Sequence, residues 1–193
     1  MEYDVGKREI VLGRSLSELD FFVLDFLKIL KKYADYVIIS GYISILLGRS
    51  RATEDIDLFL EKISFDRFLL LYTELLKNEF WCLNADKPLE VYSYLSEGLA
   101  VRFARKNMSI PNFEIKFPKR EIDKGTFEDF IVVRLKKGDV KISSLERQIA
   151  FKRYYLKSDK DIEDALHIEK VFQEKIDWEK INKLRSIIED IRN

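Results

Sequence analysis

The sequence contains few of the residues that build several common kinds of site. It has one cysteine, Cys82, which excludes an internal disulfide and a cysteine-based zinc site. His167 is the only histidine, so histidine-rich metal sites are excluded, and a Ser-His-Asp or Cys-His hydrolase would have to use that imidazole. No signal peptide and no apolar run of about 18 residues is present. We therefore expect a soluble, cytoplasmic protein without a membrane partner.

An excess of charge of one sign is also missing. Lys+Arg and Asp+Glu both number 34, so the net charge does not indicate nucleic-acid binding. Binding of nucleic acid would need a local basic patch. Hydrophobic residues make up 47% of the chain, which excludes a disordered protein and predicts a packed core. A chain of 193 residues is long enough for one large core, or for a main domain and a small helical one.

The apolar pattern changes near residue 142. Before that point, short strand-like runs mix with helical segments, and from Ser144 onward the pattern is helical. We predict an α/β (α+β) fold with a core over residues 1–142 and a helical C-terminal subdomain over residues 143–193. The expected strands are 36–40, 55–60, 80–83, 99–105, 112–117, 127–135 and 140–142. The expected helices are 17–32, 42–48, 66–77, 88–95, 144–156, 160–173 and 177–191.

Two carboxylates, Asp55 and Asp57, open the strand predicted over residues 55–60. Alternate residues of a strand share a face, so both carboxylates point one way while Ile56 and Leu58 point toward the core. At a separation of about 5 Å and an effective dielectric of about 20, they repel by about 3 kcal/mol. A divalent cation such as Mg²⁺ removes this repulsion. On its own, however, the pair is better explained by a solvated start of a strand.

Small and basic residues before the pair favour a phosphate-binding interpretation. Ser40 and Gly41 lie between a predicted strand and a predicted helix, where small residues and free amides let a phosphate approach the backbone. Arg49 and Arg51 come just before the acidic strand and could bind other phosphate oxygens. Each arginine alone is better explained by a charged loop, so the interpretation depends on the combination.

This combination resembles the signature of polymerase-beta-like nucleotidyltransferases, a Gly-Gly or Gly-Ser turn followed by a spacer and Asp-x-Asp. Here the turn is Ser40-Gly41, with serine in place of the first glycine, and the acidic pair is Asp55-Ile-Asp57. Tyr42 and the string Arg51-x-Thr53-x-Asp55 are similar to the small prokaryotic branch that includes AbiEii-type toxin nucleotidyltransferases.

The resemblance implies a nucleotidyltransferase-type mixed sheet flanked by helices. It also implies transfer of a nucleoside monophosphate from an NTP, such as ATP, to a hydroxyl acceptor. Asp55 and Asp57 would bind one or two Mg²⁺ ions, with Glu114 as the third metal ligand and the general base. The acceptor stays open among RNA, protein and a small molecule. A role as the toxin of a toxin–antitoxin pair, with an antitoxin as partner, is also implied.

The role of Glu114 has two alternatives. It shares one face of a predicted strand with Lys116, and an ion pair on a solvated sheet face explains it equally well. If Lys116 occupied the third acidic position, the protein would be a catalytically degenerate module that binds nucleotide or a partner.

The resemblance also assigns residues to the nucleotide. Lys152, after Phe151, and Asp164, in a Lys-Asp-x-x-Asp string that starts at Lys160, match features of the toxin-like branch. With the turn, the nucleotide-binding set is Ser40, Gly41, Arg51, Thr53, Lys152 and Asp164.

Simpler roles compete with some of these assignments. Lys152 is also explained as an ordinary surface lysine, and Asp161 as a capping partner of Ser158. We expect His167 to pair locally with Asp164. An RNA-binding alternative depends on a local basic strip formed by Arg102, Arg105, Lys106, Lys116, Lys119 and Arg120.

Overall fold

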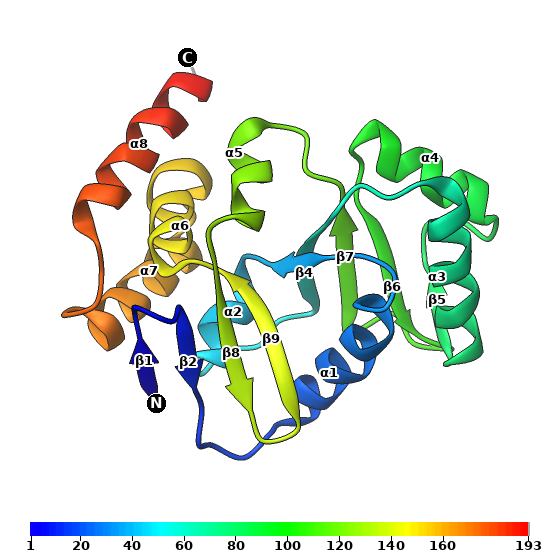
Figure 1. The fold of residues 1–193 in the computed structure, drawn as a ribbon, viewed down its shortest axis with the longest axis horizontal. Helices are drawn as coiled ribbons and strands as arrows, with labels where there is room; N and C mark the ends of the chain where they lie inside the picture. Colours follow the sequence, from blue (N-terminus) through cyan, green and yellow to red (C-terminus); the bar gives the residue numbers. More distant parts are fainter. Residues whose placement is uncertain (193) are drawn as a thin grey trace.

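The computed structural model describes residues 1–192 and contains a mixed sheet of nine strands with helices packed around it (Figure 1). The order across the sheet differs from the order along the chain, so distant segments become neighbours. From edge to edge the strands are β1 (Glu2–Asp4), β2 (Glu9–Val11), β8 (Phe130–Leu135), β9 (Gly138–Ser143), β3 (Tyr36–Ile38), β4 (Asp55–Leu60), β7 (Asn112–Lys116), β6 (Val101–Arg105) and β5 (Phe80–Cys82).

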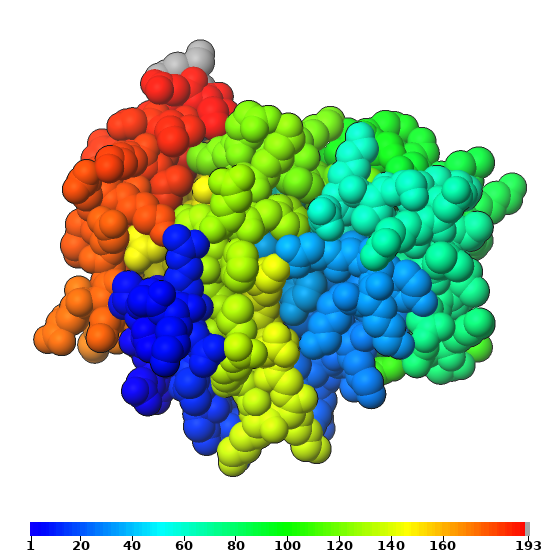
Figure 2. Space-filling view, in the orientation of Figure 1, coloured from blue at the N-terminus to red at the C-terminus, as the bar shows by residue number. Residues whose placement is uncertain are grey.

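The helices gather at the two ends of this sheet and over its middle (Figure 1). They are α1 (Glu18–Leu30), α2 (Gly41–Leu46), α3 (Phe65–Lys77), α4 (Pro88–Glu97), α5 (Glu121–Lys124), α6 (Leu145–Ala150), α7 (Asp159–Phe172) and α8 (Trp178–Arg192). The C-terminal helices lie beside the N-terminal strands, as the adjacent blue and orange surfaces of Figure 2 show. The rings of Tyr3 and Phe172 meet there edge to face, 5.7 Å apart.

The predicted mixed α/β fold is confirmed, and several local signals explain its elements. Ser17 caps α1 in a capping box with Asp20, as its sequence suggests. Pro88 begins α4, and Gly98 ends it in the left-handed conformation with a φ of 76°. Cys82 is a buried free thiol.

The elements differ locally from the predictions. The helix expected over residues 144–156 is α6 followed by a π-helix (Phe151–Leu156). The N-terminal strands β1 and β2 and helix α5 are additional to the expected elements. The boundary expected between residues 142 and 143 falls within β9. It stays a prediction, because one apolar cluster includes both Ile142 and Leu145.

Helix α1 fixes the position of the segment that follows β3. The Tyr42 hydroxyl donates a 2.8 Å hydrogen bond to Asp20, which is fully buried and also binds the Arg14 guanidinium. On the other side, the rings of Phe26 in α1 and Phe113 in β7 stack 4.1 Å apart. Helix α1 therefore sets the relative positions of the turn at residues 40–41 and of the central strands β4 and β7. Within residues 1–192, no helix is long and apolar enough to cross a membrane.

Candidate active site

The two carboxylates at the start of β4 lie where the sequence placed them. Asp55 and Asp57 are half-buried on one face, whereas Ile56 and Leu58 are fully buried on the other. Strand β4 pairs in parallel with β7, and the register sets Asp57 beside Glu114. Lys116 is in register with Phe59, one step further along. The position next to Asp57 therefore belongs to Glu114 and not to Lys116.

Asp57 is the carboxyl group whose ionisation the fold penalises. Burial and the neighbouring Asp55 charge raise the pKa of Asp57 to about 6, and Glu114 adds to the rise. The Lys116 ammonium and a hydrogen bond from the Ser40 hydroxyl act in the opposite direction. An ionised pair at this position lacks sufficient cationic compensation from the protein, which is the electrostatic setting in which a divalent cation binds favourably.

Ser40 connects the turn to this pair through an unusual backbone conformation. Its φ of 65° and ψ of −139° lie in a region that favours glycine, so the serine is strained there. Gly41 follows at the start of α2, and the Arg51 guanidinium lies against its Cα, so that a side chain at residue 41 would displace it. The turn therefore brings the backbone of Gly41, the Arg51 guanidinium and Asp57 close together, and its role in binding phosphate stays a prediction.

Arg51, Lys152 and Asp164 meet beside this turn in one buried ionic cluster. Asp164 is fully buried, with Oδ2 2.9 Å from Arg51 Nη1 and 2.8 Å from Lys152 Nζ. Arg49 binds its other oxygen, Oδ1. Burial opposes the ionisation of Asp164, but Lys152, Arg49 and Arg51 outweigh it and hold its pKa below the ordinary value. The cluster joins the loop before β4 to α7.

This cluster changes the interpretation of its members. Lys152 is 1% exposed and also lies 3.2 Å from Asp161, so its alternative as an ordinary surface lysine is wrong. Ser158 caps α7 through the Asp161 amide, as expected. The charges of Lys152 and Arg51 are already matched by carboxylates of the protein.

His167 and Thr53 have local partners. The expected pairing of His167 with Asp164 is wrong, because three cations from other elements occupy Asp164, and His167 Nε2 lies 3.1 Å from the Leu47 carbonyl oxygen. The Thr53 hydroxyl donates a 3.0 Å hydrogen bond to the backbone carbonyl of Asp55. Thr53 therefore fixes the chain at the first carboxylate.

Glu114 has a cross-strand partner. Arg102 of β6 lies opposite it, with Nη2 2.8 Å and Nε 3.1 Å from Glu114 Oε2. In the described part of the chain, no group of three or more His, Cys, Asp or Glu side chains is placed to hold a metal ion. The donor set of Asp55 and Asp57 fits Mg²⁺, which takes one or two carboxylates together with substrate phosphates. Glu114 is adjacent to that set but paired with Arg102.

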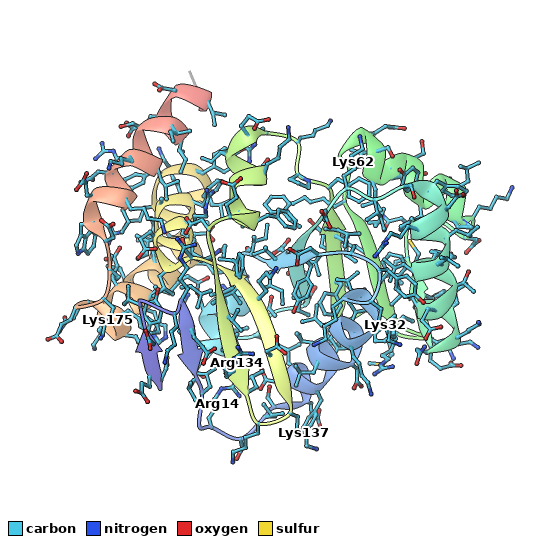
Figure 3. The ribbon with its side chains drawn as sticks, viewed as in Figure 1. Arg14, Lys32, Lys62, Arg134, Lys137 and Lys175 are labelled. Atoms are coloured by element: carbon cyan, nitrogen blue, oxygen red, sulfur yellow. The ribbon has the colours of Figure 1, made fainter. Side chains whose placement is uncertain are left out.

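The basic strip considered for RNA is divided by ion pairs. Arg102 pairs with Glu114, Arg105 with Asp25, Lys106 with Glu79, and Arg120 with Asp123. Cations elsewhere are spread over the surface: Lys62, Lys137 and Lys175 point outward at three different edges of the molecule (Figure 3). Lys116 and Lys119 are the members of the strip that have no ion pair among residues 1–192.

A cavity of ≈ 430 Å³ opens beside the turn and the second carboxylate. Ser40 and Asp57 form one part of its wall, Lys116 and Lys119 another, and the π-helix closes it with Lys152 and other residues. The sequence placed Lys119 in the basic strip considered for RNA, three residues after Lys116, and not in the nucleotide-binding set. Nothing in the apolar pattern indicated the π-helix, because the spacing suits an α-helix equally well.

Comparisons with known proteins agree with this geometry at the level of the fold. An antigenic nucleotidyltransferase-like protein from Paracoccidioides brasiliensis superposes with a TM-score of 0.52 at 16% identity, covering 92% of this chain and 90% of that chain. ANT(2″)-Ia in complex with adenylyl-2″-tobramycin gives a TM-score of 0.54 at 11% identity, covering 92% and 100%. No family model and no curated protein matches the sequence. The chain therefore has a nucleotidyltransferase-like fold.

Proposed function

We propose that this protein is a Mg²⁺-dependent nucleotidyltransferase that moves a nucleoside monophosphate from an NTP to a hydroxyl acceptor. The observation that carries the proposal is the half-buried Asp55 and Asp57 pair, which lies beside the strained Ser40-Gly41 turn in a nucleotidyltransferase-like fold. Two carboxylates on one strand face would hold the cation. When bound, Mg²⁺ supplies charge stabilisation for the attacking and leaving oxygens.

The chain's own residues then have separate tasks. The Ser40 hydroxyl donates a hydrogen bond to Asp57 and favours its ionised form, and Thr53 fixes the backbone at Asp55. Glu114 is adjacent to Asp57 and would take the proton of the acceptor hydroxyl once its carboxylate is released from Arg102. The buried cluster around Asp164 holds Arg51 against Gly41 and so keeps the turn in shape.

The test is label transfer from an NTP. The protein is incubated with each labelled NTP and Mg²⁺ together with total RNA, a protein extract or small polyhydroxylated compounds, and the wild type is compared with Asp55→Asn/Asp57→Asn. We expect transfer by the wild type and loss of at least about a hundredfold in the double variant, because charge stabilisation at a reacting phosphate is usually worth that much. Unchanged transfer by the double variant would refute the assignment of the site.

A second function is favoured by one specific observation. The carboxylate that should complete the site, Glu114, is bound by Arg102 in this structure. A degenerate module that binds nucleotide or a partner without transferring a group would have this arrangement permanently. Mg²⁺-dependent NTP binding without label transfer, measured in the same preparation, would favour this alternative.

The finer details of the proposal have separate support. ANT(2″)-Ia, solved with adenylyl-2″-tobramycin, supports a small-molecule acceptor and ATP as donor, although RNA and protein acceptors stay in the test. The AbiEii-type relationship, the toxin–antitoxin role and the antitoxin partner depend on the resemblance of the Ser40–Leu58 string. The proposed location is the cytoplasm, where NTPs and Mg²⁺ are available.

A further inference from the structure

Within residues 1–192, two lysines in the wall of the cavity have no anionic partner. Lys116 is half-buried at the end of β7, and its ammonium lies 5.8 Å from the centre of the Phe59 ring. Lys119 is exposed, and its side chain passes over Gly98 at the end of α4. Neither forms an ion pair within the described chain, although Lys116 is close enough to Asp57 to influence its ionisation.

The other cations of the cavity wall are already neutralised. Arg120 lies 2.7 Å from Asp123, Arg147 lies 2.9 Å from Asp129, and Lys152 is held by Asp161 and Asp164. A cation that gives up a carboxylate to bind a phosphate leaves a buried charge unpaired, which is costly. An anionic ligand therefore gains most from the two lysines that have no carboxylate to give up.

We propose that Lys116 and Lys119 bind the triphosphate tail of the donor nucleotide, an inference that rests on the proposed function. The tail would extend from Asp57 along the end of β7 toward Lys119, with its β- and γ-phosphates at the two ammonium groups. In the transfer, the acceptor oxygen forms a bond to the α-phosphorus, and the bond to the β-phosphate oxygen breaks. Pyrophosphate leaves with that electron pair, and a carboxylate takes the acceptor's proton.

The size and shape of the cavity agree with a small anionic ligand. Its volume of ≈ 430 Å³ lies within the range of about 300–1,000 Å³ that is usual for small-molecule sites. Phe117 and Phe151 add apolar wall beside the lysines, as a nucleoside requires. In this assignment Arg51 and Lys152 do not bind phosphate. They stay paired with Asp164 and have a structural role.

The experiment measures the binding of sodium tripolyphosphate and of ATP by calorimetry, without divalent cations and with no acceptor. Lys116→Met and Lys119→Met keep an apolar stem and remove the charge, and Lys116→Arg keeps the charge. We expect about tenfold weaker binding of both probes by each methionine variant, and near-normal binding by Lys116→Arg. The control is Lys175→Met, an exposed lysine outside the cavity (Figure 3), which should bind like the wild type.

Three results would overturn the inference. These are failure of the wild type to bind tripolyphosphate, unchanged binding by Lys116→Met/Lys119→Met, and an equal loss in Lys175→Met, which would indicate unspecific attraction. Thermal unfolding confirms that each variant is folded. The binding test contains neither metal nor acceptor, so its outcome is separate from that of label transfer: transfer without lysine-dependent binding refutes this inference alone.

Discussion

At the scale of single residues, Ser40 has the most unusual backbone at the site. Its positive φ suits glycine, yet its hydroxyl donates a hydrogen bond to Asp57. Strain of about 1–3 kcal/mol is the usual cost of such a conformation. The serine therefore destabilises the backbone but adds a hydrogen bond to Asp57 that glycine could not make. This hydrogen bond is a physical reason for serine at a position where the resembled family has glycine.

This strain predicts an order of stability between two variants that both lack the hydroxyl. Ser40→Gly relieves the strain, whereas Ser40→Ala keeps the Cβ atom and with it the strain. Ser40→Gly should be more stable than Ser40→Ala by about 1 kcal/mol or more, after allowing for the entropy of glycine. Urea unfolding measures the difference, and equal stabilities would contradict the strain.

The raised pKa of Asp57 predicts how stability depends on pH. Because its folded pKa of about 6 exceeds the ordinary value of 3.8 for an aspartate, the folded state binds the proton more tightly. The contribution of Asp57 to stability is therefore full below about pH 4 and is lost as pH rises through about 6. The change in the free energy of unfolding that Asp57→Asn causes should therefore depend on pH. It should be more stabilising near pH 8 than near pH 4, by up to about 3 kcal/mol. A difference between variant and wild type that does not change with pH would contradict the shift.

We predict that removal of the Arg102 side chain strengthens metal binding. Arg102→Met frees Glu114, so that three carboxylates can approach one cation, and the affinity for Mn²⁺ should rise several-fold. Calorimetry measures this without any substrate. Arg102→Met/Glu114→Gln should return to the wild-type affinity, and a single variant with unchanged affinity would show that Arg102 does not restrain Glu114.

At the scale of elements, the Asp164 cluster holds α7 to the loop before β4. Asp164→Asn leaves Lys152 buried with only Asp161 as its anionic partner, and it should lower the free energy of unfolding by about 3–5 kcal/mol. The matched control is Glu163→Gln, which removes an exposed partner of Arg49 on the same helix and should cost about 0.5 kcal/mol or less. Chemical denaturation compares the two variants. Similar losses of unfolding free energy for both would show that the Asp164 cluster does not hold α7 to the loop before β4.

The elements also show what sequence patterns can predict. Strand β4 and its face of two carboxylates were predictable, because alternation is a local property of the chain. The caps at Ser17 and Ser158 were predictable for the same reason. The π-helix was not predictable, because the spacing of apolar residues over 151–156 is also compatible with an α-helix.

At the scale of the whole molecule, the site depends on pairings between distant segments. The register of β4 with β7 places Glu114 beside Asp57, and the register of β6 with β7 places Arg102 on Glu114. Neither register can be read from one strand alone, because each depends on the packing of helix α1 and the order of the sheet. The sequence therefore predicted the carboxylate pair and the turn, but not the partners that neutralise Lys152, Arg51 and Glu114.

The most direct test of the account is the fate of the individual phosphates of the donor. With NTP labelled at the α-phosphate, the account predicts Mg²⁺-dependent label in the acceptor and none with Asp55→Asn/Asp57→Asn. With NTP labelled at the γ-phosphate, it predicts label only in released pyrophosphate. Label from the γ-phosphate in the acceptor would show a different phosphoryl transfer, and α-label transfer that survives both the double variant and metal chelation would contradict the central claim.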